Sequence, residues 1–295
     1  MFSRIFVGID REGAGDRAAV AAVRLQQRFG SEVHFVHAIS MFWRSWSQAA
    51  MAAWEATKVQ SLAARKQAFV QRLAATLRCH DLPMDDIEGL VEVKEGQPAE
   101  LLVQKADRPT DLIALGGHRE LGFLHFGATA RSVLAKAHCP VWIQSHDFEM
   151  LRRVTVGVDL SPQTDTVVRA ALELATRLGA SLKVVHAFEL PTLASGIEPY
   201  FAVDQLRKDS MAAFERIVAD LRTTYPSRLE AEFSDGEPWQ VLQKQSREGD
   251  VVVVGTHGHS ALLRTVIGST AYRVCKHSLH PVMVVPMPER AFRSA

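Results

Sequence analysis

A group of glycine, serine and threonine residues near the end of the chain has the composition of an anion-binding loop. It begins at Gly255, directly after four consecutive valines, and continues with Gly258 and then Gly268-Ser269-Thr270. Glycines let a backbone approach an anion closely, and the N–H groups that open a helix point toward it. The chemistry that these residues favour is the binding of phosphate.

Two elements must position this loop, a strand before it and a helix after it. The valines at 251–254 predict a strand buried on both faces, and residues 271–277 predict a short helix. A further strand is predicted at 281–285. The loop would therefore be held at both ends by regular structure.

The same order of elements occurs twice along the 295 residues. The matched pairs that lie 149 positions apart are Asp10 and Asp159, Gly30 and Gly179, and His37 and His186. Each half alternates strands and helices, which predicts a parallel sheet with helices on both faces. We therefore predict an α/β protein with two doubly wound, five-stranded, Rossmann-like domains in tandem, 1–149 and 150–295, joined by a polar linker at 144–153.

The predicted strands also bring separate residues together. Asp159, Ala187 and Gly255 each lie at the carboxyl end of a predicted strand. Ligands of such sheets bind beyond the carboxyl ends, where the strand order reverses. The three residues are thus expected at one site, beside the glycine-spaced loop.

The loop resembles that of the nucleotide-binding members of the universal stress protein family, which carry Gly-x2-Gly-x9-Gly-Ser/Thr. Gly255, Gly258, Gly268 and Ser269 fit this spacing without a gap, and Asp159 corresponds to the family's strand-one aspartate. Because both halves share the resemblance, the chain resembles a tandem universal stress protein with domains of the adenine-nucleotide-binding type. The resemblance implies bound ATP or ADP, with or without Mg²⁺, a cytoplasmic location and a regulatory role in stress response.

The resemblance also implies roles for the residues of the second half. Gly255 and Gly258 would let the loop wrap the phosphates, while Gly268, Ser269 and Thr270 would donate hydrogen bonds to them. An alternative for Ser269 is a plain helix N-cap, and the two roles are compatible.

Four other residues would complete the site. Asp159 would accept hydrogen bonds from ribose hydroxyls or help to hold a metal, although Asp-Leu-Ser-Pro is also good turn chemistry. Ala187 and Val254 would line the adenine slot, with core packing as the alternative. His257 would face solvent and touch phosphate.

The first half departs from the pattern. Its loop, 116–129, is two residues shorter than its counterpart, Arg119 replaces the second glycine and Ala128 replaces Ser269. We expect weaker nucleotide binding there, or none. An alternative is that Arg119 contacts phosphate itself, since arginine pairs well with phosphate.

Composition limits the function classes. A net charge of +1 gives no strong field for nucleic acid, and the three cysteines, an odd number, suit a reducing compartment. Cys139, which precedes Pro140 at the start of a predicted strand, is predicted to be buried. No apolar run approaches the roughly 20 residues that span a bilayer, and the N-terminus does not have the pattern of a signal peptide.

The sequence has neither the Gly-Lys-Ser/Thr ending of a P-loop nor the Gly-x-Ser-x-Gly motif of a serine nucleophile. A binding or regulatory module is therefore favoured over an adenylyl-transfer enzyme, with slow ATP hydrolysis left open. A second alternative is a carrier or scaffold that binds an apolar ligand or partner through the first half. It rests on the segment 41–54, which holds three of the five tryptophans and precedes a helix predicted at 57–78. The strands at 140–143 and 281–285 are predicted to pair the halves as an internal pseudo-dimer. Homodimerisation and a protein partner are left open.

Overall fold

The computed structural model describes residues 1–40, 48–120, 123–125, 127–146, 150–189, 200–256 and 267–286. The chain divides into two compact units, one made mostly of residues 2–147 and the other mostly of residues 148–295.

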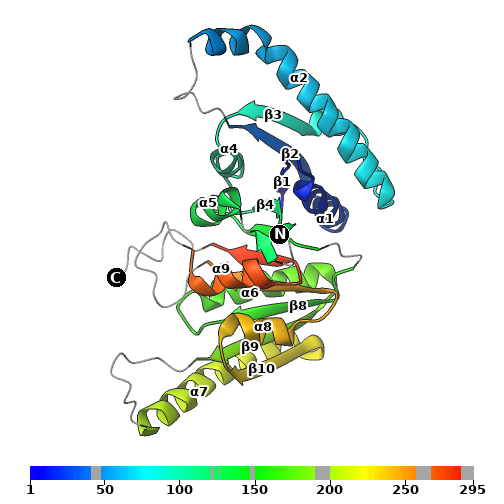
Figure 1. The fold of residues 1–295 in the computed structure, drawn as a ribbon. Helices are drawn as coiled ribbons and strands as arrows, with labels where there is room; N and C mark the ends of the chain where they lie inside the picture. Colours follow the sequence, from blue (N-terminus) through cyan, green and yellow to red (C-terminus); the bar gives the residue numbers. More distant parts are fainter. Residues whose placement is uncertain are drawn as a thin grey trace. The chain divides into compact units, whose positions relative to one another are not determined.

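The first half contains a parallel sheet. Its elements are β1 (Arg4–Gly8), α1 (Ala14–Phe29), β2 (Glu32–Ile39), α2 (Gln48–Cys79), α3 (Ile87–Leu90), β3 (Val91–Glu95), α4 (Pro98–Lys105), β4 (Asp111–Gly116), β5 (His118–Glu120), β6 (Phe123–His125), α5 (Ala128–Lys136) and β7 (Val141–Gln144). The strand order is β7-β4-β1-β2-β3, and all of these neighbours are parallel. Helices cover both faces of the sheet (Figure 1).

The second half repeats this arrangement. Its elements are β8 (Arg153–Val158), α6 (Thr164–Leu178), β9 (Ser181–Phe188), α7 (Tyr200–Thr224), the 3₁₀ turn η2 (Pro226–Arg228), β10 (Leu229–Asp235), α8 (Pro238–Gln245), β11 (Asp250–Gly255), α9 (Ser269–His277) and β12 (Val282–Val285). The parallel order is β12-β11-β8-β9-β10. The predicted Rossmann-like parallel sheet is confirmed in both halves, and the strand order reverses between β8 and β11.

Apolar spacing predicts helices at 18–29 and 166–178, each stopped by the glycine that follows, and the structure confirms these ends but places both starts earlier. Gly30 and Gly179 end α1 and α6 in the left-handed region, with φ of 69° and 64°. Helix α1 begins at Ala14 rather than Ala18, because the Asp10 carboxylate accepts the N–H groups of Gly13 and Ala14 at 2.7 and 3.1 Å. Such capping satisfies N–H groups that have no partner within the helix.

Helix α2 also begins early, at Gln48 instead of Thr57. Two side chains hold its first turns to β3: Trp54 Nε1 donates to Glu95 at 2.5 Å, and Lys58 pairs with the same carboxylate at 2.6 Å. Trp54 of the tryptophan-rich segment is therefore helical. Residues 41–47 lie outside the described residues, so the apolar-ligand alternative stays a prediction.

Each half has an arginine–aspartate pair at the amino ends of its central strands, at the opposite edge from the Asp159 and Gly255 ends. Arg153 on β8 contacts Asp250 on β11 at 2.7 Å, and Arg4 on β1 contacts Asp111 on β4 at 2.6 Å. Asp250 and Asp111 are buried. The two halves thus share this packing device as well as the strand order.

The cysteines differ in exposure. Cys139 and Cys275 are buried, as predicted for Cys139, and Cys79 is exposed. Burial raises the pKa of the Cys139 thiol to about 12 and raises that of Cys275 as well. Neither is expected to form the reactive thiolate at neutral pH.

We therefore predict that a chromogenic disulfide reagent labels one thiol per native chain and three per chain in denaturant. Cys79 is exposed, whereas Cys139 and Cys275 are buried. Absorbance at the end of each reaction gives the count. Rapid labelling of a second thiol in the native protein would contradict the burial of Cys139 or Cys275.

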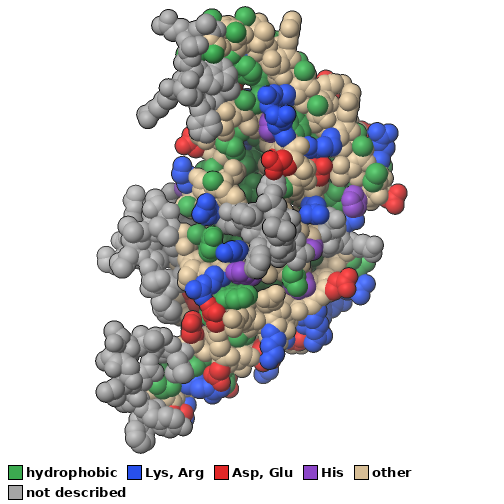
Figure 2. Space-filling view, viewed as in Figure 1, with side chains coloured by type: hydrophobic (Ala, Val, Ile, Leu, Met, Phe, Trp, Pro, Cys, Tyr) green, Lys and Arg blue, Asp and Glu red, His purple; other side chains and the backbone are tan. Residues whose placement is uncertain are grey.

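Surface charge is mixed. On the face drawn in Figure 2, basic and acidic side chains of the described residues are interspersed rather than gathered into one large patch. This agrees with the small net charge of +1. Among the described helices, none is both long and apolar enough to cross a membrane.

Candidate functional site

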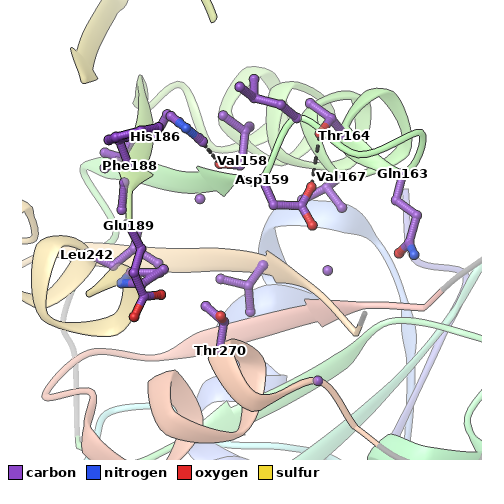
Figure 3. A pocket seen from close by; sticks show the side chains of 18 of the residues that line it. Val158, Asp159, Gln163, Thr164, Val167, His186, Phe188, Glu189, Leu242 and Thr270 are labelled. Carbon is purple, nitrogen blue, oxygen red and sulfur yellow. Dashed lines mark hydrogen bonds between the residues drawn. The ribbon is translucent and has the colours of Figure 1, made fainter. Parts of the chain in front are cut away.

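A cavity of about 710 Å³ lies at the carboxyl ends of β8, β9 and β11 (Figure 3). It adjoins the point where the strand order reverses, which is where ligands of such sheets bind. The predicted residues that line it are Asp159, Ala187, Val254, Gly255, Gly268, Ser269 and Thr270. His257 and Gly258 were also predicted, and both lie outside the described residues.

Asp159 closes a tight turn and also lines the cavity. Its Oδ1 accepts the N–H of Ser161 at 3.0 Å and the hydroxyl of Thr164 at 3.2 Å (Figure 3). Leu160, between Asp159 and Ser161, has a φ of 61°, in the left-handed region that costs a non-glycine residue about 1–2 kcal/mol. Both sequence interpretations of Asp159, a turn residue and a residue at the site, are therefore compatible with its geometry. Such backbone strain is common at ligand sites.

His186 fixes the strand end that precedes Asp159. Its Nδ1 lies 2.8 Å from the carbonyl oxygen of Val158. A carbonyl can only accept, so Nδ1 carries the hydrogen. His37 makes the same bond to Ile9 at 2.9 Å in the first half, where burial lowers the pKa of the imidazole. The repeat in the sequence pairs these histidines but does not reveal this role.

The start of α9 presents backbone donors at the cavity. Gly268 N–H donates to the Thr256 carbonyl at 2.7 Å, and the first N–H bonded back to Gly268 is that of Tyr272 at 3.0 Å. The intervening N–H groups, of Ser269 to Ala271, precede the helical hydrogen-bond pattern, and all three residues line the cavity. With the positive end of the helix dipole, they form a site suited to an anion.

The N-cap position of α9 differs from the sequence alternative. Gly268 occupies it, without a side-chain cap, and Ser269 is the first helical residue. The interpretation of Ser269 as a plain N-cap is therefore wrong. The reason is the Gly268 bond to Thr256, which places the chain reversal one residue earlier.

Several lining residues were not predicted from the sequence. They include Gln163 at the start of α6, Phe188 and Glu189 at the end of β9, Asp209 on α7 and Leu242 on α8. Figure 3 shows Gln163 at one side of the cavity and Glu189 and Leu242 at the other, with Asp159 and Thr270 between them. None of the five belongs to the glycine pattern, and only the fold brings them to it.

In the first half, the region that corresponds to the cavity lies around Asp10 and Gly116. This corner is occupied by the backbone of the same half. A Cβ on Gly116 would lie 1.7 Å from the carbonyl oxygen of Ala14, so this carbonyl packs directly on Gly116. The Asp10 carboxylate is used by the start of α1.

Arg72 of α2 also occupies this corner, at the end of β1. It donates to the carbonyls of Asp10 and Arg11 and pairs with Asp16 at 3.0 Å. Burial raises the pKa of Asp16 despite this partner. The side chain of Arg119 lies outside the described residues.

Comparison of the sequence with known protein families identifies the family of the chain. The sequence pattern of the universal stress protein family matches residues 1–144 and 150–286, so the chain belongs to this family, with two of its domains in tandem. It is similar to a universal stress protein of Mycolicibacterium smegmatis, with 24% identity over 95% of this chain and 96% of that protein.

Two further comparisons agree. A universal stress protein of Mycobacterium tuberculosis is 29% identical over 59% of this chain and 61% of its own length. The crystal structure of a universal stress protein from Archaeoglobus fulgidus shares the fold, with a TM-score of 0.66, 17% identity and coverage of 96% of this chain and 98% of that one.

Proposed function

We propose that the second half binds ATP or ADP in the cavity beside β8 and β11, and that the protein is a regulatory module governed by this occupancy. The observation that carries the proposal is the convergence of seven residues predicted from sequence on one cavity of about 710 Å³. That volume lies within the range of about 300–1,000 Å³ typical of small-molecule sites. The choice of adenine rests on the glycine pattern of the loop.

The phosphates would meet the start of α9. Ser269, Thr270 and Ala271 line the cavity at the first turn of this helix, where N–H groups and the helix dipole favour negative charge. The hydroxyl of Thr270 lies on the same wall (Figure 3). Gly268 allows the phosphates to approach without a side chain between them.

The ribose and base would occupy the remainder of the cavity. Asp159 would accept hydrogen bonds from ribose hydroxyls, since its carboxylate lies on the cavity wall (Figure 3). Ala187 and Val254 would contact the base, because their small side chains leave room at the strand ends. Phe188 and Leu242 extend this apolar wall.

The donor set suits phosphate better than a protein-held metal. Among the described residues, no group of three or more His, Cys, Asp or Glu side chains is placed to bind a metal ion. A Mg²⁺ ion would take most of its ligands from the nucleotide and water, with Asp159 as the carboxylate at hand. When bound, it would neutralise phosphate charge.

A binding role is proposed over catalysis, because phosphoryl transfer also needs a Lys or Arg that clamps the phosphate and a residue that orients the nucleophile.

We propose a cytoplasmic location. We also propose one nucleotide per chain, since the first-half corner is filled by Ala14 and Gly116. Pairing of the halves through β7 and β12, further dimerisation and a protein partner stay predictions.

Isothermal titration calorimetry of the full chain with ATP, ADP and GTP tests the proposal. We expect saturable binding of ATP or ADP at one site per chain and weaker binding of GTP. Mass spectrometry of small molecules extracted from the purified protein is the companion measurement. The proposal fails if no adenine nucleotide is recovered and no heat of binding is seen.

A further inference from the structure

The side chain of Gln163 on the cavity wall has no partner among the described residues. Gln163 is 6% exposed, yet its carboxamide makes no hydrogen bond to the described parts of the chain. Its backbone N–H donates to Ser161 Oγ at 3.2 Å, and its carbonyl accepts from Thr166 and Val167. Only the side chain is therefore unused.

The carboxamide of Gln163 is open to the cavity. Among the described residues, the fully buried side-chain atoms without a hydrogen-bond partner are Asp16 Oδ1 and Arg72 Nε, and the amide atoms of Gln163 are not among them. Because the carboxamide of Gln163 faces a cavity and not a packed core, a ligand or water can supply the missing bond.

The two ends of the cavity differ in charge. Glu189 lies on the side opposite Gln163 (Figure 3), and Asp209 adds a second carboxylate to the lining. These carboxylates disfavour a phosphate chain beside them. The end that holds Gln163 offers a neutral donor instead, and Thr270 of the first turn of α9 lies between the two ends in this view.

The first half provides an internal comparison. The repeat offset of 149 aligns Gln163 with Ala14, which has no side-chain donor and whose carbonyl packs on Gly116. The glutamine thus occurs in the half that has the cavity. Its counterpart is absent where the corner is closed.

Resting on the nucleotide-binding function proposed above, we infer that Gln163 is a specificity residue. Its carboxamide N–H donates to the outer phosphate of the bound nucleotide, on the side away from Glu189. The residue then distinguishes phosphorylated nucleosides from the bare nucleoside. Its oxygen remains available for water or for a ribose hydroxyl.

Titration calorimetry of full-length Gln163→Met and Gln163→Glu with ATP and with adenosine tests this inference. A hydrogen bond to a charged group contributes enough that Gln163→Met should weaken ATP binding by about 10- to 100-fold. Gln163→Glu should weaken it further, because a carboxylate repels phosphate. Adenosine affinity should change less than about twofold in Gln163→Met, since it lacks the bonded group.

The matched control is Gln240→Glu, which makes the same change of charge at an exposed position on α8. It should leave ATP affinity unchanged. Circular dichroism melting of each variant verifies the fold, and a glutamate at the start of α6 is compatible with the helix dipole. Equal losses for ATP and adenosine, or no loss in either variant, would overturn the role of Gln163 while nucleotide binding stands. Absence of ATP binding in the unmodified chain would instead overturn the proposed function itself.

Discussion

Replacing Ala187 by phenylalanine is expected to abolish nucleotide binding while the protein stays folded. Ala187 lies near the end of β9, is half-buried and lines the cavity, so a larger side chain would project into the space proposed for the base. A clash built into a pocket acts against the ligand and not against the empty fold. Affinity for ATP should fall by at least about 100-fold, equivalent to about 2.7 kcal/mol.

The repeat supplies a matched control in Ala38→Phe. Ala38 has the same place in β2, is also half-buried, and follows His37 as Ala187 follows His186. Its half has the closed corner of Ala14 and Gly116, so ATP affinity should not change. Titration calorimetry compares the variants, and equal effects of the two substitutions would show that the site was wrongly assigned.

Removing the Asp250 carboxylate should destabilise the second half more than any surface change. The carboxylate is 3% exposed, pairs with Arg153 at 2.7 Å and also accepts from Thr155 Oγ1 at 3.0 Å and Arg247 N–H at 2.9 Å. Burial acts against the charge of Arg153, but bonding to Asp250 outweighs it and raises the pKa of the guanidinium. Asp250→Ala leaves this guanidinium buried with the half-exposed Glu230 as its remaining carboxylate partner, and breaking such a buried pair costs about 3–5 kcal/mol.

Urea unfolding followed by circular dichroism measures this effect. Because the chain has two units, two transitions can occur, and only that of the second half should move. Asp235→Ala breaks the exposed pair with Arg207 and should leave both midpoints nearly unchanged. An Asp250→Ala variant with unaltered midpoints would mean that the buried pair contributes nothing to the stability of this unit.

Much of the fold could be predicted because its signals are local. Buried valines at 251–254 indicate β11, and Gly30 and Gly179 indicate helix ends through their left-handed backbone. The repeat then supports each half with the other. The predicted strands show where each strand ends, and these ends give the positions of Asp159, Ala187 and Gly255.

Residues whose role depends on distant partners could not be predicted. The Arg153–Asp250 pair joins residues 97 positions apart, and neither belongs to a motif. Gln163 reads as an ordinary residue near a helix start until the fold places its side chain on the cavity wall. The positive φ of Leu160 could not be predicted either, because nothing in leucine indicates such a backbone conformation.

Helix starts were predicted too late for a related reason. Apolar periodicity begins only where a helix meets the core, whereas α1 starts at Ala14 through the Asp10 cap. In α2 the early turns contact β3 through Trp54 and Lys58, which are polar contacts that periodicity does not register.

Native mass spectrometry of the full chain with ATP most directly tests whether the second half is the nucleotide site. The expected spectrum shows one nucleotide per unmodified chain, one per Ala38→Phe chain and none per Ala187→Phe chain. Two nucleotides on the unmodified chain, none at all, or one retained by Ala187→Phe would contradict it.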